Sequence, residues 1–417
     1  MKSLPRIMLF SGVCLVLSAN GHARTSAIRL PEHHILTTSD TQKNTSPDIQ
    51  MMSEQSAKST RLSPASQSYD YSVFAPKTQT SNIKLDYSIW DAALQNVVLS
   101  MGESLRKRAR RPDPTIGTHI VRGHRTPFRL EGSRIAFSYL STDYVEGLKE
   151  YRNDLVRIAN EIDIQSLSQK EQLAFWYNLH NVLLIQEIAE HYPVKRPREL
   201  VIGPNNEKLH DAKLVTINGI PLSLRDIRTK IVYQNWHNPN VIYGFFLGDI
   251  GGPAIQPYAV TANNLNYVLS SQAHEFVNSL RGYHKNSDAH KVSLIYQEAR
   301  PYLFKNWPKD LETHLKKHAN EDVLKDLSRH LPFEFGRYDD VIADLMGGER
   351  PSLAVNVYSD GKPVGESVPI EIRRLAAELS RKKKILRKRG LYQGKALVTI
   401  TDIETEDPDT PSQNEQP

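Results

Sequence analysis

Apolar residues recur at helical spacing in several stretches of the chain. The first runs from residue 85 to 97, where an apolar side chain returns every three or four positions. A longer helix is expected after Ser168, because Ser168 and Glu171 have the spacing of a capping box. This helix would extend to Ile188 with apolar residues on most of its faces. We therefore expect it to be buried on most sides.

The next segments have the patterns of short strands. Residues 213–217 form one expected strand, and Asn218-Gly219 is typical of a hairpin turn. The returning segment leads into a helix with Ser223 as its N-cap. Residues 241–247 are a continuous apolar run, whose length and composition favour a fully buried strand.

The last third of the chain is expected to be mostly helical. Residues 261–280 have one apolar side, and Gly282 is placed as a C-cap. Four elements are expected after residue 310: charged helices, a hairpin turning at 360–361, a basic helix over 371–388 and a strand over 396–401. The predicted fold class is α+β, with mixed helices around a central sheet and a small C-terminal α/β appendage.

The first 23 residues have the pattern of a signal peptide. Lys2 and Arg6 precede an apolar run over 7–17, and small residues lead to a cleavage site at Ala23. We therefore expect export, to the periplasm or beyond. The expected organisation is a signal peptide at 1–23, a disordered leader at 24–84, a core domain at 85–309, a C-terminal helical and small α/β region at 310–403 and a disordered acidic tail at 404–417.

Cysteine usage and charge exclude several functions. Cys14 is the only cysteine and lies inside the expected signal peptide, so the mature chain would have neither disulfides nor a thiol nucleophile. Val13 before it disfavours lipid attachment. Cleavage removes Lys2 and Arg6 and lowers the net charge from +6 to +4, a mild excess that argues against nucleic acid as a partner. No later segment approaches the roughly 20 apolar residues of a membrane span.

One string resembles a known family signature. Residues 171–181 read EQLAFWYNLHN, which is similar to the signature QLAFWINLYNA of the family called domain of unknown function 547. The string WDAAL at residue 90, the LSLxDI element at 222–227 and a Pro-terminated segment at 240–253 agree in order. The resemblance covers roughly residues 88 to 305. The positions that carry it are Trp176, Asn178, Asn181, Asp226 and Pro253.

This sequence departs from the family where chemistry is expected. Relatives resemble LSLDDIEH and RVHFALNCGSKSCP in the later motifs. Aligned without gaps, the Glu-His pair becomes Arg228-Thr229, the Arg becomes Asn240, the His becomes Ile242 and the two Cys become Leu247 and Gly252. The resemblance implies that any cysteine-dependent activity of relatives is lost here, so we expect no catalytic residue to carry over.

Other candidate residues have a structural and a functional interpretation. Asn178 and Asn181 share a helix face, where they could hold a neighbouring loop or bind a ligand, whereas His180 points elsewhere as a packing or surface residue. The glycine-rich loop at 248–252 favours tight backbone geometry over phosphate binding, and Asp249 is expected to be exposed there and able to bind a ligand.

A histidine pair and a basic helix complete the candidates. His314 and His318 are one turn apart, but no third ligand is identifiable, so neither a metal nor any other cofactor is expected. The basic residues of the C-terminal helix could be a solvated face or could dock on an anionic envelope surface. They are Arg381, Lys382, Lys383, Lys384, Arg387, Lys388 and Arg389, with Ile385 and Leu386 as apolar anchors.

The preferred hypothesis is a non-catalytic binding or scaffold protein of the cell envelope. Its partner would be an unknown envelope protein or an anionic surface. The alternative is a hydrolase or transferase that acts on an envelope polymer or peptide without a cysteine nucleophile.

Overall fold

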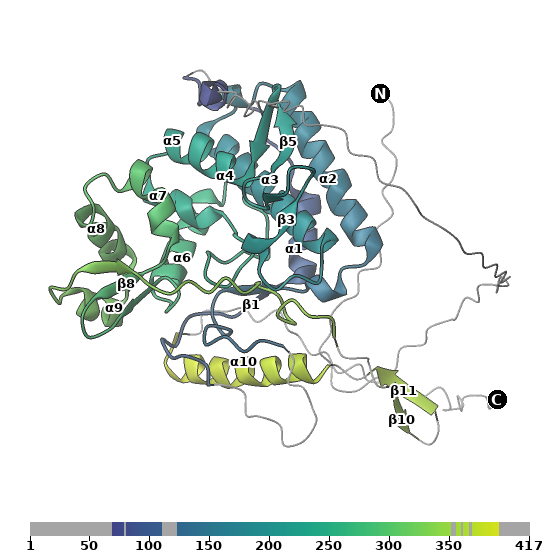
Figure 1. Ribbon diagram of the computed structural model, residues 1–417, viewed down its shortest axis with the longest axis vertical. Coiled ribbons are helices and arrows are strands. Elements are labelled where there is room, and N and C mark those ends of the chain that lie inside the picture. Colours follow the sequence, from purple (N-terminus) through teal and green to yellow (C-terminus); the bar gives the residue numbers. More distant parts are fainter. Residues whose placement is uncertain are drawn as a thin grey trace, which may run out of the picture.

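A long buried helix lies at the centre of the molecule (Figure 1). The computed structural model describes residues 69–78, 81–110, 123–351, 356–359, 362–366 and 369–391. Helix α3 (Gln169–Glu190) buries 17 of its 22 residues, as its apolar pattern predicts. Ser168 Oγ accepts a hydrogen bond from the Glu171 amide at 3.2 Å, which confirms the predicted cap. The Glu171 carboxylate does not return this bond to Ser168, but accepts the Leu85 amide at 2.9 Å.

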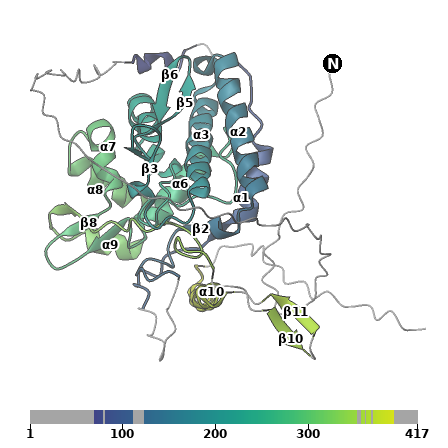
Figure 2. The ribbon, with the colours of Figure 1, turned by 45° about the vertical axis from the view of Figure 1, so that its right-hand side comes forward.

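Two further helices flank α3. Helix α2 (Thr142–Glu161) lies alongside it in both ribbon views (Figures 1 and 2). Helix α1 (Ser88–Val97) forms where the first apolar pattern predicts it. The described part of the predicted leader is folded: residues Tyr71–Phe74 form the 3-10 helix η1, and the fully buried Phe74 ring packs edge-on against Trp176 at 5.3 Å between centroids.

The strands are short and form small separate sheets. The α+β class is confirmed, but the described strands make five sheets of two or three strands instead of one central sheet. The antiparallel pairs are β1 (Val98–Ser100) with β2 (Ser133–Ile135), β3 (Val201–Ile202) with β4 (Glu207–Lys208), β5 (Lys213–Ile217) with β6 (Ile220–Ser223), and β10 (Asn356–Ser359) with β11 (Lys362–Glu366). Strands β7 (Tyr283–Lys285) and β8 (His290–Val292) are antiparallel, and β9 (Phe333–Phe335) joins β8 in parallel.

The remaining helices are short except the last. They are η2 (Phe137–Tyr139), η3 (Ile164–Ser166), η4 (Pro197–Glu199), α4 (Leu224–Asp226), the π-helical η5 (Ile227–Val232), α5 (Tyr233–Asn235), η6 (Pro239–Gly244), α6 (Leu265–Val277), α7 (Ile295–Leu303), α8 (Lys309–His318), α9 (Glu321–Leu327) and α10 (Ile370–Lys388). The hairpins at 213–223 and 356–366 and the helix after Ser223 agree with the predictions.

Residues 241–247 are buried but do not form a strand, so that prediction is wrong. The segment begins with η6, where Pro239 occupies the first turn and Asn238 caps the Asn240 amide at 3.1 Å. Phe245 after η6 is extended, and residues 245–247 have no regular secondary structure. The side chain of Asn181 supplies the hydrogen bonds that a neighbouring strand would have made, as described below.

Gly282 also has a different role from the one predicted. Helix α6 ends at Val277 and its C-cap is Asn278, so Gly282 does not cap it. A Cβ atom at Gly282 would lie 2.0 Å from the Phe276 carbonyl oxygen. Glycine is therefore required because the backbone passes close to the end of α6.

Helix α10 packs beside β1 and β2, at the lower edge of the view in Figure 1. It contributes Leu375 and Leu379 to a small apolar cluster with Met101, Ala136 and Leu345. The strand predicted at 396–401 and the acidic tail lie outside the described residues. No helix in the described ranges is both long enough and apolar enough to cross a membrane.

Candidate functional site

The positions aligned with the relatives' reactive groups lie in the interior. Arg228 is 3% exposed and Ile242 is 2% exposed, and the other aligned positions are buried with them. These other positions are Thr229, Asn240, Leu247 and Gly252. The question is therefore which groups these residues contact and whether any space remains beside them.

Arg228 is the centre of a buried ion cluster. Its π-helical segment, η5, turns the guanidinium toward α3 and α7. Nε and Nη2 donate to the two carboxylate oxygens of Glu298 at 2.7 and 3.0 Å, a bidentate pair. Nη1 donates to the Leu224 carbonyl at 3.2 Å and lies 3.0 Å from His180 Nε2 and 3.4 Å from His210 Nδ1. The charge of Arg228 is thus neutralised inside the protein.

The cluster continues through His180 to the loop after η6. A guanidinium can only donate, so His180 Nε2 accepts and the imidazole proton is on Nδ1. Nδ1 donates to Asn181 Oδ1 at 3.1 Å. The Asn181 amide in turn donates to the Gly244 carbonyl at 3.2 Å and accepts the Phe246 amide at 3.0 Å. His180 is completely buried, so it is a packing residue with polar contacts and not a surface residue.

The electrostatic environment fixes the protonation states of the cluster. Burial, aided by the charge of Arg228, lowers the pKa of His180 to about 3. The same two causes bring the pKa of His210 well below its ordinary value. Burial acts to raise the pKa of Glu298, but the charge and hydrogen bonds of Arg228 outweigh it and bring the pKa to about 2. At neutral pH the cluster is therefore one ion pair with two neutral imidazoles.

A second ion pair lies beside the first. Arg198 Nε donates to Asp249 Oδ2 at 2.5 Å, and Tyr338 donates its hydroxyl proton to Asp249 Oδ1 at 2.6 Å. Asp249 Oδ1 also accepts the Gly252 amide at 3.0 Å. The prediction that Asp249 is exposed is wrong, because its side chain is completely buried. Gly248 has a φ of +82°, which turns Asp249 inward.

A small cavity lies between the two ion pairs. It has a volume of about 30 Å³, and Arg198, Glu298, Ile242, Leu247 and Pro253 are among its lining residues. One water occupies roughly 30 Å³ in the liquid, whereas ligand sites have volumes of about 300–1,000 Å³. This cavity, which borders the aligned positions Ile242 and Leu247, therefore has room for a solvent molecule but not for a substrate.

The protonation states of the cluster indicate a structural role and not general acid–base catalysis. An efficient general base has a pKa near the working pH. Here the histidine pKa values fall well below 7 and the Glu298 pKa falls further, so no member of the cluster exchanges protons near neutrality. The cluster instead ties α3, η5 and α7 together.

Asn178 holds a second loop in the same manner as Asn181. Its amide nitrogen donates to the Val260 carbonyl at 2.6 Å, and its Oδ1 accepts the Val260 amide at 3.1 Å. Both asparagines thus make paired hydrogen bonds to the backbone of a neighbouring segment. Of the two interpretations of these residues, the contacts correspond to loop positioning.

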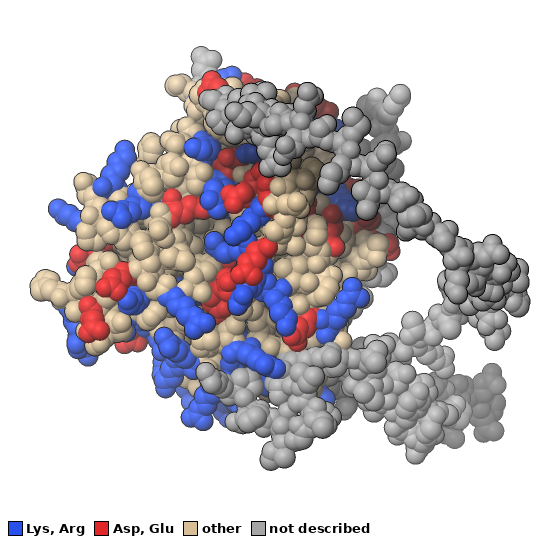
Figure 3. All heavy atoms as spheres, in the orientation of Figure 1, with Lys and Arg blue, Asp and Glu red and all other residues tan. Residues whose placement is uncertain are grey.

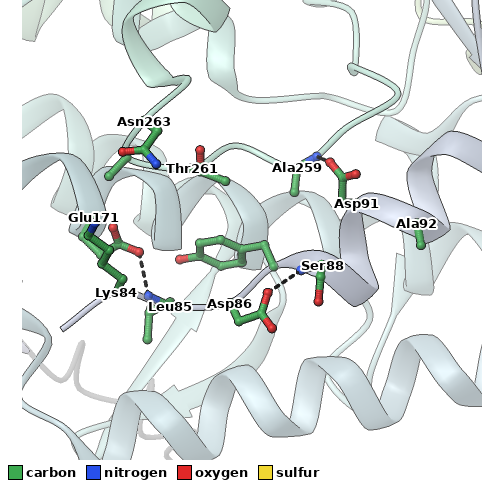
Figure 4. A pocket seen from close by; sticks show the side chains of 12 residues that line it. Lys84, Leu85, Asp86, Ser88, Asp91, Ala92, Glu171, Ala259, Thr261 and Asn263 are labelled. Atoms are coloured by element: carbon green, nitrogen blue, oxygen red, sulfur yellow. Dashed lines mark hydrogen bonds between the residues drawn. The ribbon is translucent and has the colours of Figure 1, made fainter.

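The loop that Asn178 holds forms one wall of a larger hollow (Figure 4). The hollow has a volume of about 360 Å³, within the range of small-ligand sites. The residues that line it come from the start of α1, the first turn of α3 and the loop after Ala259: Lys84, Leu85, Asp86, Tyr87, Ser88, Asp91, Ala92, Glu171, Ala259, Thr261, Ala262 and Asn263. The carboxylates of Glu171, Asp86 and Asp91 accept the amides of Leu85, Ser88 and Ala259.

The histidine pair of α8 is part of the core. His314 Nε2 lies 2.8 Å from the Tyr243 hydroxyl, and His318 Nε2 lies 2.8 Å from Asn240 Oδ1. Burial lowers the pKa of His314 to about 3 and that of His318 to about 4. The described residues contain no group of three or more His, Cys, Asp or Glu side chains placed to hold a metal ion.

The remaining family-motif residues support the scaffold. Trp176 is fully buried in the aromatic core. Asp226 completes a capping box with Ser223 and pairs with Lys213. Pro253 lines the small cavity. Trp176 and Asp226 lie apart from the small cavity and the larger hollow, since neither is among the residues that line them.

The basic residues of α10 do not share one environment. Lys382 is only 3% exposed and donates to the carbonyls of Gly102 at 3.1 Å and Leu130 at 2.5 Å. Lys383 is half-buried. The others, Arg381, Lys384, Arg387, Lys388 and Arg389, are exposed. Of the two predicted apolar anchors, Ile385 is 42% exposed, whereas Leu386 is buried against the body of the protein.

The ion cluster could hardly be predicted from the sequence. Arg228 is the one detectable signal, as a charged residue at a position that helical periodicity turns toward the apolar side of its segment. Arg198, His210 and Glu298 come from separate elements and meet only in the folded protein. No local pattern connects them.

Comparison with known proteins agrees with the resemblance. The family model described as "Protein of unknown function, DUF547" matches residues 164–277, a little over a quarter of the chain. This stretch contains α3, the hairpin, η5 and α6, and thus Arg228, His180 and both loop-holding asparagines. No curated protein and no solved structure matches the chain.

Proposed function

We propose that this protein is an exported protein of the cell envelope that uses a DUF547-type scaffold for binding or assembly and not for catalysis. One observation carries the proposal. Ile242 and Leu247, two of the positions aligned with the relatives' motif residues, line a cavity of only about 30 Å³, and the charged groups beside it are already paired, Arg198 with Asp249 and Glu298 with Arg228. A site of this kind has neither the room nor the free groups for a substrate.

The alternative, a hydrolase or transferase without a cysteine, rests on the histidines and carboxylates of the same cluster. Strongly shifted pKa values often mark active sites. Here the direction of the shifts argues against catalysis, because His180 stays neutral down to a pH of about 3 and Glu298 stays ionised down to about 2. A binding protein is therefore the better supported of the two.

The hollow of Figure 4 has room for a small ligand or a peptide side chain. Ala92 lines it, is exposed and lies on α1. An Ala92→Trp substitution would fill the hollow without touching the core. Thr313→Trp adds the same bulk to an exposed position of α8, and thus serves as a matched control.

The test combines affinity capture and a turnover assay with the mature protein. We expect wild type and T313W to capture the same component from solubilised envelope, and A92W to lose it. We also expect no change in purified envelope polymers or peptide libraries incubated with the protein, followed by mass spectrometry. Turnover that His210→Gln abolishes, or no component captured by the wild type, would contradict the proposal. Equal capture by all three proteins would exclude the hollow as the binding site.

A further inference from the structure

Helix α10 has two faces of different chemistry. The face toward the body is apolar, with Ile372, Leu375, Leu379 and Leu386 between 1% and 5% exposed. The opposite face is exposed and basic. In Figure 3, which has the orientation of Figure 1, Lys and Arg side chains gather along the lower edge of the molecule where α10 lies.

The acidic residues of α10 do not reduce the charge of the outer face. Glu378 forms a bidentate pair with the buried Arg129, at 2.7 and 2.8 Å. Glu371 is 6% exposed. Lys382 is also directed inward, onto the carbonyls of Gly102 and Leu130, so it fixes the helix to the body and takes no part in the outer surface.

The charged residues of the outer face are therefore all cationic. Arg381, Lys384 and Lys388 follow at spacings of three and four, which places them on one stripe. Arg373 extends the stripe toward the start of the helix, and Arg389 follows its last residue. All five side chains are exposed, and none forms an ion pair with another described residue.

Exposed aliphatic side chains accompany these cations. Ile370 is 65% exposed, Ile385 is 42% exposed and Leu391 is 49% exposed. They lie at the start, along the length and just beyond the end of α10. Exposed large apolar residues within a basic helix are typical of helices that lie in a membrane interface, where the cations contact headgroups and the aliphatic groups enter the acyl boundary.

We propose that the outer face of α10 docks on the surface of an anionic lipid bilayer, with the helix axis parallel to that surface. The cations alone would fit any polyanion. The aliphatic side chains favour lipid, because a nucleic acid or an anionic polysaccharide offers them no apolar partner. This surface is separate from the cluster around Arg228, so the proposal stands whether or not that cluster proves catalytic.

Vesicle sedimentation with the mature, full-length protein tests the docking. We expect binding to vesicles of phosphatidylcholine with 30% phosphatidylglycerol, no binding to pure phosphatidylcholine, and weaker binding at high salt. Each basic residue at such a surface contributes roughly fivefold in affinity. The triple variant R381Q/K384Q/K388Q should therefore bind about a hundredfold more weakly.

A second triple variant distinguishes binding by the outer face of α10 from an effect of net charge. K230Q/K305Q/K309Q removes the same three charges from exposed positions outside α10, and should bind like wild type. Ile385→Ser should weaken binding to vesicles but not to heparin or a DNA oligomer, since those polyanions contact only the cations. Equal loss in the two triples, no binding to anionic vesicles, or tighter binding to the polyanions than to the vesicles would overturn the proposal.

Discussion

Polar side chains of the central helix α3 hold other segments of the chain in place. Asn178 and Asn181 each hold a separate backbone segment, and His180 between them connects Asn181 to Arg228. Buried polar groups are costly unless they are hydrogen-bonded, so such residues make the packing of the loops specific. The amide pair could be interpreted from sequence as loop-holding, because most side-chain hydrogen bonds go to the backbone.

Stability should depend on pH through His180. Its pKa is about 3 in the folded protein and near 6.5 when unfolded, so the unfolded chain binds more protons between these values. The free energy of unfolding should therefore decrease as the pH falls from 6.5 toward 3, with up to about 1.4 kcal/mol per pH unit from this residue. Urea denaturation at several pH values should give His180→Gln a smaller slope than wild type.

The exposed His237 provides the control for this measurement. His237→Gln should leave the pH dependence unchanged. An unchanged slope in His180→Gln would show that His180 is not held neutral by its surroundings. Other buried histidines, such as His124 and His314, are expected to account for the slope that remains.

At the scale of elements, those with a clear local signal were predicted and those fixed by tertiary contacts were not. The helix after Ser168 and the hairpin at Asn218-Gly219 have caps, turns and periodicity of their own. The apolar pattern of residues 241–247 predicts that they are buried, but it does not distinguish a strand from another conformation. The path of their backbone depends on the hydrogen bonds of Asn181. Helix α2 was missed, although Ser141 caps it, because its polar surface conceals the buried Leu148, Leu155 and Ala159.

The path of the segment after η6 also depends on Gly244. A Cβ atom at this position would lie 2.4 Å from the Tyr177 ring, which is fully buried and donates its hydroxyl proton to the Val241 carbonyl. Gly244→Ala should therefore destabilise the protein by roughly 1–3 kcal/mol through overpacking. Thermal and urea unfolding measure the change.

Gly147 provides the control for the Gly244 substitution. It lies in α2, and a Cβ atom there would meet no other atom within 4 Å. Gly147→Ala should stabilise the protein by roughly 0.5–1 kcal/mol, because alanine favours the helix. A G244A variant as stable as wild type would mean that the loop does not approach α3 as closely as described.

At the scale of the whole molecule, the segment that matches the family model forms much of the interior, and the two proposed contact surfaces lie at its edge and outside it. The match ends at residue 277, whereas α10 begins at Ile370. The hollow of Figure 4 lies at the edge of the matched segment, between α1 and the first turn of α3.

The proposed location of these surfaces in the cell envelope depends on export of the protein. We expect the protein isolated from cells to begin at Arg24, since the first 23 residues have the pattern of a cleaved signal peptide. Mass spectrometry of the intact protein from a periplasmic or secreted fraction would measure this. A chain that keeps Met1 and stays in the cytoplasm would remove the envelope from the account.

The most direct test of the central claim is the free energy of unfolding of Arg228→Met. If the cluster is structural, R228M leaves Glu298, whose side chain is 28% exposed, without its partner, and urea denaturation should show a loss of about 2–4 kcal/mol that R228M/E298M partly recovers. Residues kept for catalysis often cost stability, so their replacement leaves a protein equally or more stable. An R228M variant as stable as wild type would therefore contradict the account and return the cluster to consideration as an active site.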